Sequence, residues 1–191
     1  MKRIGLGVAL PLLGLTLLLA ACLPKVAPPY AGGLATEPTN LRPYRNEQTG
    51  VNMGLAPGWV EEPVAPGGDA DLRAQFKKPG SSARMLVYCL GAFTPRAGIH
   101  LKVLQLTEAV SPSATRLWET QSLGGGNFDP EFSAWTGPVE SDGKQVPMNF
   151  YIGGKLDNLG SHCKYAVWTI VGKGEASRIE GDFLAMMRSL K

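Results

Sequence analysis

The sequence CKYAVWTIVG, residues 163–172, decides the fold of this chain. Successive side chains of a strand point to opposite faces, and here both faces are apolar. One face would carry Ala166, Trp168 and Ile170, and the other Tyr165, Val167 and Val171. A strand that is apolar on both sides belongs in the middle of a sheet covered on both faces. We therefore expect Cys163 to Val171 to be a central strand.

The segment that follows, ASRIEGDFLAMMRSL, has the pattern of an amphipathic helix. Ser177 and Glu180 match a capping box, which predicts that the helix starts there. Asp182 and Arg188 would lie off the apolar face. The face predicted to pack on the sheet consists of Ile179, Phe183, Met186, Met187 and Leu190.

Earlier segments supply further strands. Met85 to Leu90 is apolar at every position, which indicates a second central strand. Leu72, Ala74 and Phe76 alternate with polar residues, the pattern of a half-buried strand. Two more strands are expected near residues 132–139 and 146–152. Asp142-Gly143 between them is a hairpin signal.

The middle of the chain carries patterns of both helix and strand. Ile99 to Val110 fits both a helix and an alternating strand, and we favour the helix. Ser111-Pro112 resembles an N-cap followed by a first-turn proline, so a second helix is expected over Ala114, Leu117 and Trp118. The glycines at 124–126 would end it.

Strands, a helical middle, more strands and a closing helix predict an α+β fold, with one antiparallel sheet and helices packed on it. The globular domain is expected to span residues 45–191. Its turn Leu55-Ala56-Pro57-Gly58-Trp59, and its late strand end Thr169-Ile170-Val171-Gly172 followed by Phe183, resemble the Mog1/PsbP-like fold. This resemblance implies an α/β sandwich. It also implies a partner-binding or assembly role, because members of that fold share no active site.

The N-terminus has the layout of a secretory signal. Lys2 and Arg3 precede an apolar run, and the run closes with Leu19-Ala20-Ala21-Cys22. This ending resembles the lipobox of bacterial lipoproteins. The resemblance implies cleavage of residues 1–21 and attachment of acyl chains such as palmitate to Cys22. An uncleaved membrane helix is the alternative, although Pro11 and Gly14 weaken it.

A lipid-bearing Cys22 implies that the domain is held at a membrane through lipid. In enterobacteria-like lipoproteins an aspartate after the lipidated cysteine retains the protein in the inner membrane. Leu23 stands in that position here, so the resemblance implies the outer membrane with the domain in the periplasm, and exposure at the cell surface stays open. Residues 22–44 are rich in Pro and Gly and predict an extended tether. If part of this tether packs on the domain, Tyr30 or Tyr44 would be the anchor.

The cysteines and charges fit that placement. With Cys22 assigned to lipid, Cys89 and Cys163 remain as a pair, and an oxidising compartment favours a disulfide between them over two buried thiols. Loss of Lys2 and Arg3 with the signal leaves 17 Lys and Arg against 16 Asp and Glu. No basic run exceeds two residues, so we expect no nucleic-acid partner.

Residues with catalytic or metal-binding chemistry are few. His100 and His162 are the two histidines, and His162 adjoins Cys163, so the two side chains would point to opposite strand faces. Asp69 and Asp71 offer half of a calcium site at most, and a solvated loop is favoured. We therefore expect no enzyme, no catalytic residues, no metal and no cofactor.

Two functions follow. The first is a non-enzymatic interaction or assembly module that contacts membrane lipid through Cys22 and binds an envelope protein. The alternative is a binding module for a small apolar or glycan ligand, with Trp118 or Trp135 beside its pocket.

Overall fold

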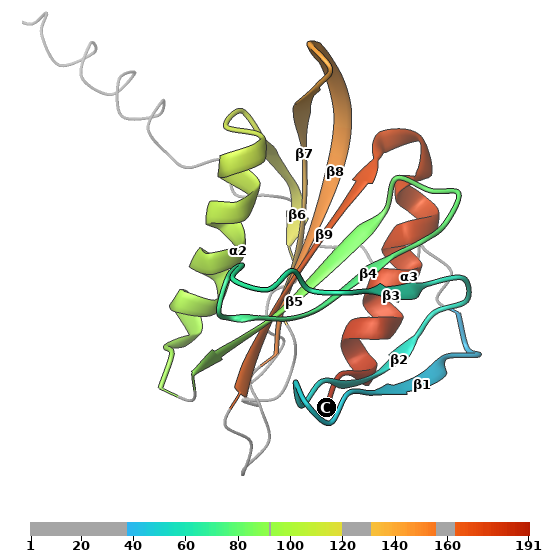
Figure 1. Cartoon of the computed structure of the whole chain (residues 1–191). Coiled ribbons are helices and arrows are strands. Elements are labelled where there is room, and N and C mark those ends of the chain that lie inside the picture. The colour runs from blue at the N-terminus through green and yellow to red at the C-terminus, as the bar shows by residue number, and fades with distance from the viewer. Residues whose placement is uncertain (1–37, 92, 120–130, 156–162) are drawn as a thin grey trace, which may run out of the picture.

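The computed structural model of the chain describes residues 38–91, 93–119, 131–155 and 163–191 (Figure 1). These residues form a seven-stranded antiparallel sheet with one helix on each face, beside a separate two-stranded sheet. This is the α+β class that the sequence predicts. The elements in chain order are β1 (Arg42–Arg45), β2 (Asn52–Leu55), β3 (Val60–Glu62), β4 (Leu72–Lys77), β5 (Arg84–Gly91), α2 (Arg96–Val110), β6 (Thr115–Glu119), β7 (Glu131–Ser141), β8 (Lys144–Lys155), β9 (Cys163–Gly172), the 3-10 helix η2 (Lys173–Glu175) and α3 (Ala176–Ser189).

Strands β5 and β9 are neighbours in the middle of the large sheet, whose order is β3-β4-β5-β9-β8-β7-β6. Both are buried on both faces, as predicted. Alternate side chains such as Val87 and Val167 belong to a core beneath α3. The residues between them, such as Tyr88 and Trp168, belong to a second core beneath α2. One sheet therefore separates two apolar cores, each covered by one helix (Figure 1).

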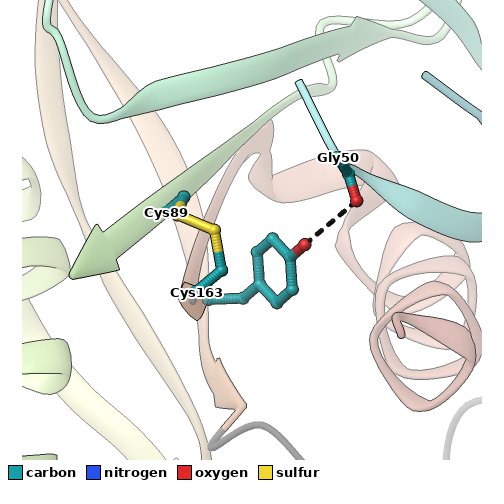
Figure 2. The surroundings of a disulfide bond; sticks show 4 residues. Gly50, Cys89 and Cys163 are labelled. Atoms are coloured by element: carbon teal, nitrogen blue, oxygen red, sulfur yellow. Dashed lines mark hydrogen bonds between the residues drawn. A yellow bond between two sulfur atoms is a disulfide. The ribbon is translucent and has the colours of Figure 1, made fainter. Parts of the chain in front are cut away.

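A disulfide joins Cys89 of β5 to Cys163 of β9 (Figure 2). Their Cα atoms are 5.1 Å apart, and 74 positions separate the two cysteines along the chain. The bond lies on the α3 side of the sheet, next to Tyr165, whose hydroxyl donates a hydrogen bond to the carbonyl of Gly50 at 3.2 Å. Together these contacts hold the end of the central strand pair and the β1–β2 turn.

Breaking this disulfide should lower the stability of the domain. A cross-link across about 74 residues removes chain entropy from the unfolded state worth roughly 4 kcal/mol. The double variant Cys89→Ser/Cys163→Ser of the full chain should lose up to that amount in its free energy of unfolding, measured with urea. Reduced wild-type protein should match the variant, and equal urea midpoints for oxidised and reduced protein would contradict the prediction.

Each helix is tied to the rest of the domain by an indole N–H group. Trp168 Nε1 donates to the hydroxyl of Thr107 in α2 at 2.9 Å. Trp59 Nε1 donates to Oδ2 of Asp182 in α3 at 2.8 Å. Both tryptophans are buried, so these bonds satisfy donors that water does not reach.

Asp182 differs from its predicted position, because it is buried rather than set off the apolar face. Besides Trp59, it accepts from Lys78 Nζ at 2.5 Å, in an ion pair whose two side chains are 15% and 8% exposed. The predicted capping box is also wrong. Helix α3 begins at Ala176 after Glu175, with no side-chain cap, so Ser177 lies inside the helix. A preceding 3-10 turn supplies the start instead.

The Pro57-Gly58-Trp59 turn explains why the ion pair is covered. Gly58 has a positive φ of 81°, which favours glycine. The turn directs Trp59 into the core, where it is 2% exposed. The Pro57-Gly58-Trp59 turn, on which the sequence resemblance partly rests, therefore positions the indole N–H group that donates a hydrogen bond to α3.

Removing the charge of Asp182 should be costly, because it strands the ammonium group of Lys78 in a mostly buried site. Asp182→Asn should lower the free energy of unfolding by about 3 kcal/mol. The matched variant Asp142→Asn changes an exposed carboxylate in the β7–β8 turn and should stay within about 0.5 kcal/mol. Similar losses in both variants, measured by urea unfolding, would refute the structural role of the pair.

The two ambiguous middle segments have different outcomes. Helix α2 confirms the helical interpretation of Ile99 to Val110. The second helix, expected over residues 114–118, is wrong, because this segment is strand β6. The register shifts between Arg116 and Trp118, so one extra residue is accommodated there as in a β-bulge. The extra residue interrupts the two-residue alternation of the strand, and the resulting spacing of apolar residues resembles that of a helix.

The folded part of the chain also starts earlier than predicted. Strand β1 begins at Arg42, inside the expected tether 22–44. The ring of Tyr44 packs edge-on against Phe76 with centroids 5.1 Å apart, so Tyr44 anchors this end. Residues 1–37, which include Cys22, Tyr30 and the predicted signal, lie outside the described residues.

Candidate functional site

Strands β7 and β8 continue past their neighbours as a two-stranded arm, residues 138–147 (Figure 1). Pairing of β6 with β7 stops at Thr136, and pairing of β9 with β8 stops at Met148. The arm ends in the predicted Asp142-Gly143 turn, where both residues have positive φ, 51° and 71°. These values fit a type I′ hairpin. All arm residues except Val139 are exposed.

Two prolines shape the edges of this arm. Pro138 and Pro147 are directly opposite each other in the register. Antiparallel pairs alternate between positions that exchange N–H···O bonds and positions whose N–H groups point outward. Proline has no N–H group, so this pair fits the second kind. Each outer edge of the arm then lacks a donor, which hinders the addition of another strand.

A groove lies where the arm meets the end of α2. It has a volume of about 610 Å³ and is open to solvent. Three separate segments line it: the last turn of α2, the turn before β6, and the arm. The lining residues are Ala109, Val110, Pro112, Ser113, Pro138, Val139, Glu140 and Gln145.

Glu140 is the one charged residue in this lining. Among the described residues it forms no ion pair. Gln145 is its direct cross-strand partner and adds an amide to the same rim. Val110 and Val146 are each 38% exposed, so apolar surface continues beside the groove. The groove thus has a mixed lining, apolar from α2 and Val139 and polar at Ser113, Glu140 and Gln145.

Close backbone contact at Gly137 sets the base of the groove. A Cβ atom at Gly137 would lie 2.3 Å from Ser111 Oγ and 2.9 Å from Ala114 Cα. Only glycine lets the turn before β6 approach β7 this closely. Ser111, predicted as an N-cap, instead follows the last residue of α2, and its buried Oγ has no hydrogen-bond partner within the described residues.

The tryptophans proposed for ligand binding lie on opposite faces of the sheet. Trp118 packs against the core beneath α3, and Trp135 against the core beneath α2. Trp135 donates to Ser133 Oγ at 3.1 Å, and the guanidinium of Arg116 lies 5.7 Å from its ring centroid. The two indoles cannot line one pocket together, and neither lines the groove.

The acidic pair near residue 70 is already neutralised. Lys102 Nζ lies 2.7 Å from Asp69 Oδ2 and 3.8 Å from Asp71 Oδ2. The hydrogen bond from Lys102 holds the pKa of the Asp69 carboxyl below its usual value. A cation site at these residues would have to displace that ammonium group, which agrees with the preference for a simple loop.

His162 and the side chain of His100 lie outside the described residues. The part of the chain that is described contains no cluster of three or more His, Cys, Asp or Glu residues suited to a metal ion. Within the same residues, no helix has the length and apolar character needed to cross a membrane.

Comparison with known proteins identifies a fold. No protein-family model matches the chain, and no protein of curated function matches it. The Ran-binding protein Mog1p of Saccharomyces cerevisiae matches with a TM-score of 0.56 and 11% identity, over 80% of this chain and 95% of that one. The cyanobacterial PsbP protein CyanoP of Synechocystis sp. PCC 6803 matches with a TM-score of 0.53 and 10% identity, over 85% and 96%.

These likenesses confirm the Mog1/PsbP-like fold that the turn and helix motifs predicted. LpqN of Mycobacterium tuberculosis, described as involved in cell envelope biogenesis, is more distant, with a TM-score of 0.43 and 9% identity over 80% of this chain and 90% of that one. At such low identity the likenesses establish the fold alone.

A side chain at residue 137 should disturb the groove. Gly137→Ala places a Cβ atom against Ser111 and the backbone of Ala114, so we expect a loss of about 1–3 kcal/mol in the free energy of unfolding. Gly174→Ala is the control, because a Cβ atom there meets nothing within 4 Å. The free energies of unfolding of the two variants are compared by urea unfolding. Equal values would show that the turn before β6 accommodates the added Cβ atom without loss of stability.

Proposed function

We propose that this protein is a lipid-anchored, non-enzymatic interaction or assembly module of the bacterial envelope. Acyl chains on Cys22 hold it in the outer membrane, and the domain works in the periplasm at the end of a tether. Its binding site is the groove at the base of the arm. The observation that carries the proposal is the arm itself, which extends beyond the sheet with an open groove of mixed polar and apolar lining beside it.

The arm supports binding of a macromolecule. It is a two-stranded ribbon with nearly all its side chains exposed, and it is longer than the sheet needs. The groove is formed by surface residues from three segments, whereas a site for small molecules usually encloses most of its ligand. An open site of this kind fits a segment of a protein surface.

The anchor and the fold give separate support. The ending Leu19-Ala20-Ala21-Cys22 resembles a lipobox, and two acyl chains give durable attachment to a bilayer. Mog1p, which shares the fold, is a Ran-binding protein. A partner-binding role on the same scaffold is therefore an analogy in favour of the proposal, and the site itself must carry the argument.

The small-ligand alternative has less support. Trp118 and Trp135 lie on opposite faces, so the two half-buried rings do not together form one platform for a sugar. Neither one lines the groove. We therefore place the protein-binding function first.

The anchor can be tested with the full chain in its native host. Wild-type protein should incorporate an alkyne analogue of palmitate and sediment with membranes, whereas Cys22→Ser should lose both properties. A photo-cross-linking residue at Gln145 in the groove should form a discrete adduct, and the same residue at Gln48, exposed in the β1–β2 turn, should not.

Two outcomes would count against the proposal. Unchanged labelling and sedimentation of Cys22→Ser would remove the lipid anchor. Recovery of the Gln145 protein only as an uncross-linked monomer, at expression levels matching the Gln48 control, would remove the interaction site.

A further inference from the structure

In the described part of the chain, one strip of the sheet face that carries α2 has no helix over it. We propose that this strip binds an amphipathic helix of another protein, whose apolar face is flanked by acidic residues. The apolar strip consists of Leu86, Val110, Val146, Met148 and Ile170. It adjoins the groove at Val110. The inference therefore rests on the proposed interaction function and names the chemistry of the partner.

The apolar strip exists because one helix is narrower than the sheet. Helix α2 packs on β8 and β9, and a helix about 10 Å wide covers roughly two strands set about 4.8 Å apart. The β3–β4 loop crosses another part of this face and reaches α2 (Figure 1), where its Asp69 meets Lys102. The carbonyl of Pro63 in this loop accepts from Gln75 Nε2 at 2.6 Å. The strip begins at Leu86, the register partner of Gln75, and ends in the arm.

The side chains of the apolar strip share one face of the sheet. Leu86, Met148 and Ile170 are half-buried and pack against the core beneath α2. Val146 is two residues from Met148 along β8, so it points to the same side, and it is 38% exposed. Val110, also 38% exposed, belongs to the last turn of α2. Burial of such surface supplies most of the binding free energy in a protein contact.

Positive charges border the apolar strip on the side away from α2. Arg84 is the register partner of Ile170, and Lys77 is the register partner of Arg84. Both cations contact the carboxylate of Glu62, with Lys77 Nζ at 2.7 Å and Arg84 Nη1 at 4.0 Å. The Arg84 side chain is 67% exposed. Two cations share one anion here, so the guanidinium of Arg84 is accessible to a further carboxylate.

Lys144 adds a third cation at the arm end of the apolar strip. It lies two residues before Val146 along β8, so both side chains point to the same face. It is exposed, and it forms no ion pair with the described residues. A carboxylate of the partner can therefore meet Lys144 without displacing another one.

Nearby carboxylates other than Glu62 do not border the apolar strip. Glu140 points to the opposite face of the arm. Glu108 lies about 200° around α2 from Val110, so it faces away from the strip. Asp142 lies beyond the strip, in the β7–β8 turn. Among the described residues the border thus carries three cations and one carboxylate, and this complementarity favours an acidic partner.

A helix fits the apolar strip better than a flat membrane does. Because α2 rises about 10 Å above the sheet beside the strip, a flat bilayer cannot reach side chains at the level of the sheet. A second helix can lie next to α2 at the usual separation of about 8–10 Å. Its apolar face then packs on the strip and its acidic flank meets Arg84, as in other cases where a helix binds in a groove.

The experiment uses the full chain in phosphatidylcholine nanodiscs, with ¹³C-labelled methyl groups. Three synthetic helical peptides of about 18 residues, or five turns, serve as probes. The first has a face of Leu and Ala flanked by Glu, the second replaces each Glu by Lys, and the third replaces each Leu by Gln. At about 1 mM, the range of weak contacts, the first should shift the methyl signals of Val146, Met148 and Ile170. The other two should bind more weakly, and empty nanodiscs measure binding of each peptide to lipid alone.

Variants separate the charge from the apolar surface. Arg84→Glu should weaken the acidic peptide roughly fivefold and strengthen the basic one. Arg84→Gln should weaken the acidic peptide by a smaller factor, without placing a second carboxylate beside Glu62. Arg45→Glu is the matched control, because Arg45 is 73% exposed and lies in the two-stranded sheet, and it should leave both affinities unchanged. Val146→Ser should weaken the acidic and basic peptides by the same factor.

Several results would overturn the inference. These are equal binding of the acidic and basic peptides, shifts centred on another surface, or no shifts at all. Shifts of the same methyl signals in phosphatidylglycerol nanodiscs without peptide would assign the apolar strip to a lipid surface instead. Broadening with protein concentration alone would assign it to a second copy of this chain.

The Gln145 cross-link separates this inference from the proposed function. If the adduct forms but acidic and basic peptides bind equally, the acidic helix is wrong and the interaction function stands. If the adduct is absent, the proposed function fails, and this inference fails with it.

Discussion

Burial of β5 and β9 on both faces is the constraint on which the rest of the structure depends. A strand pair that is apolar on both sides must be covered twice, and this one sheet therefore requires both α2 and α3. The disulfide joins the same two strands. Each helix is then fixed by one indole donor, Trp168 for α2 and Trp59 for α3. The remaining strands extend the sheet outward from this pair.

The tip of the arm, residues 140–145, takes no part in this packing, whereas Val139 at its base packs against the core beneath α2. Neither core includes residues 140–145. Stability in this region comes from the type I′ turn and from cross-strand pairs such as Val139 and Val146. The proposed binding surface therefore lies at the margin of the fold, outside both cores.

Local patterns predicted the fold well and the site poorly. The alternation in Met85 to Leu90 and Cys163 to Val171 identified both central strands, because burial on both faces leaves a direct mark on composition. A bulge at β6 broke that periodicity and imitated a helix. Asp182 looked like a surface residue, because nothing local shows that Lys78 and Trp59 meet it. The groove is lined by three segments that are distant in the sequence, so no local pattern could predict it. The strand register, which places Pro138 opposite Pro147, was needed to locate the arm that forms one of its walls.

The two cores are unequal, and this has a consequence for motion. The core beneath α3 contains more buried apolar residues than the core beneath α2, and the disulfide and the Lys78–Asp182 pair lie on its side of the sheet, whereas the ion pair that holds α2, between Lys102 and Asp69, is partly exposed. Local opening follows the weakest unit of a domain, so amide hydrogens of α2 should exchange with solvent before those of α3. Because the last turn of α2 forms one wall of the groove, occupancy of the groove would slow that exchange, and the bound state would be detectable as protection along the whole helix.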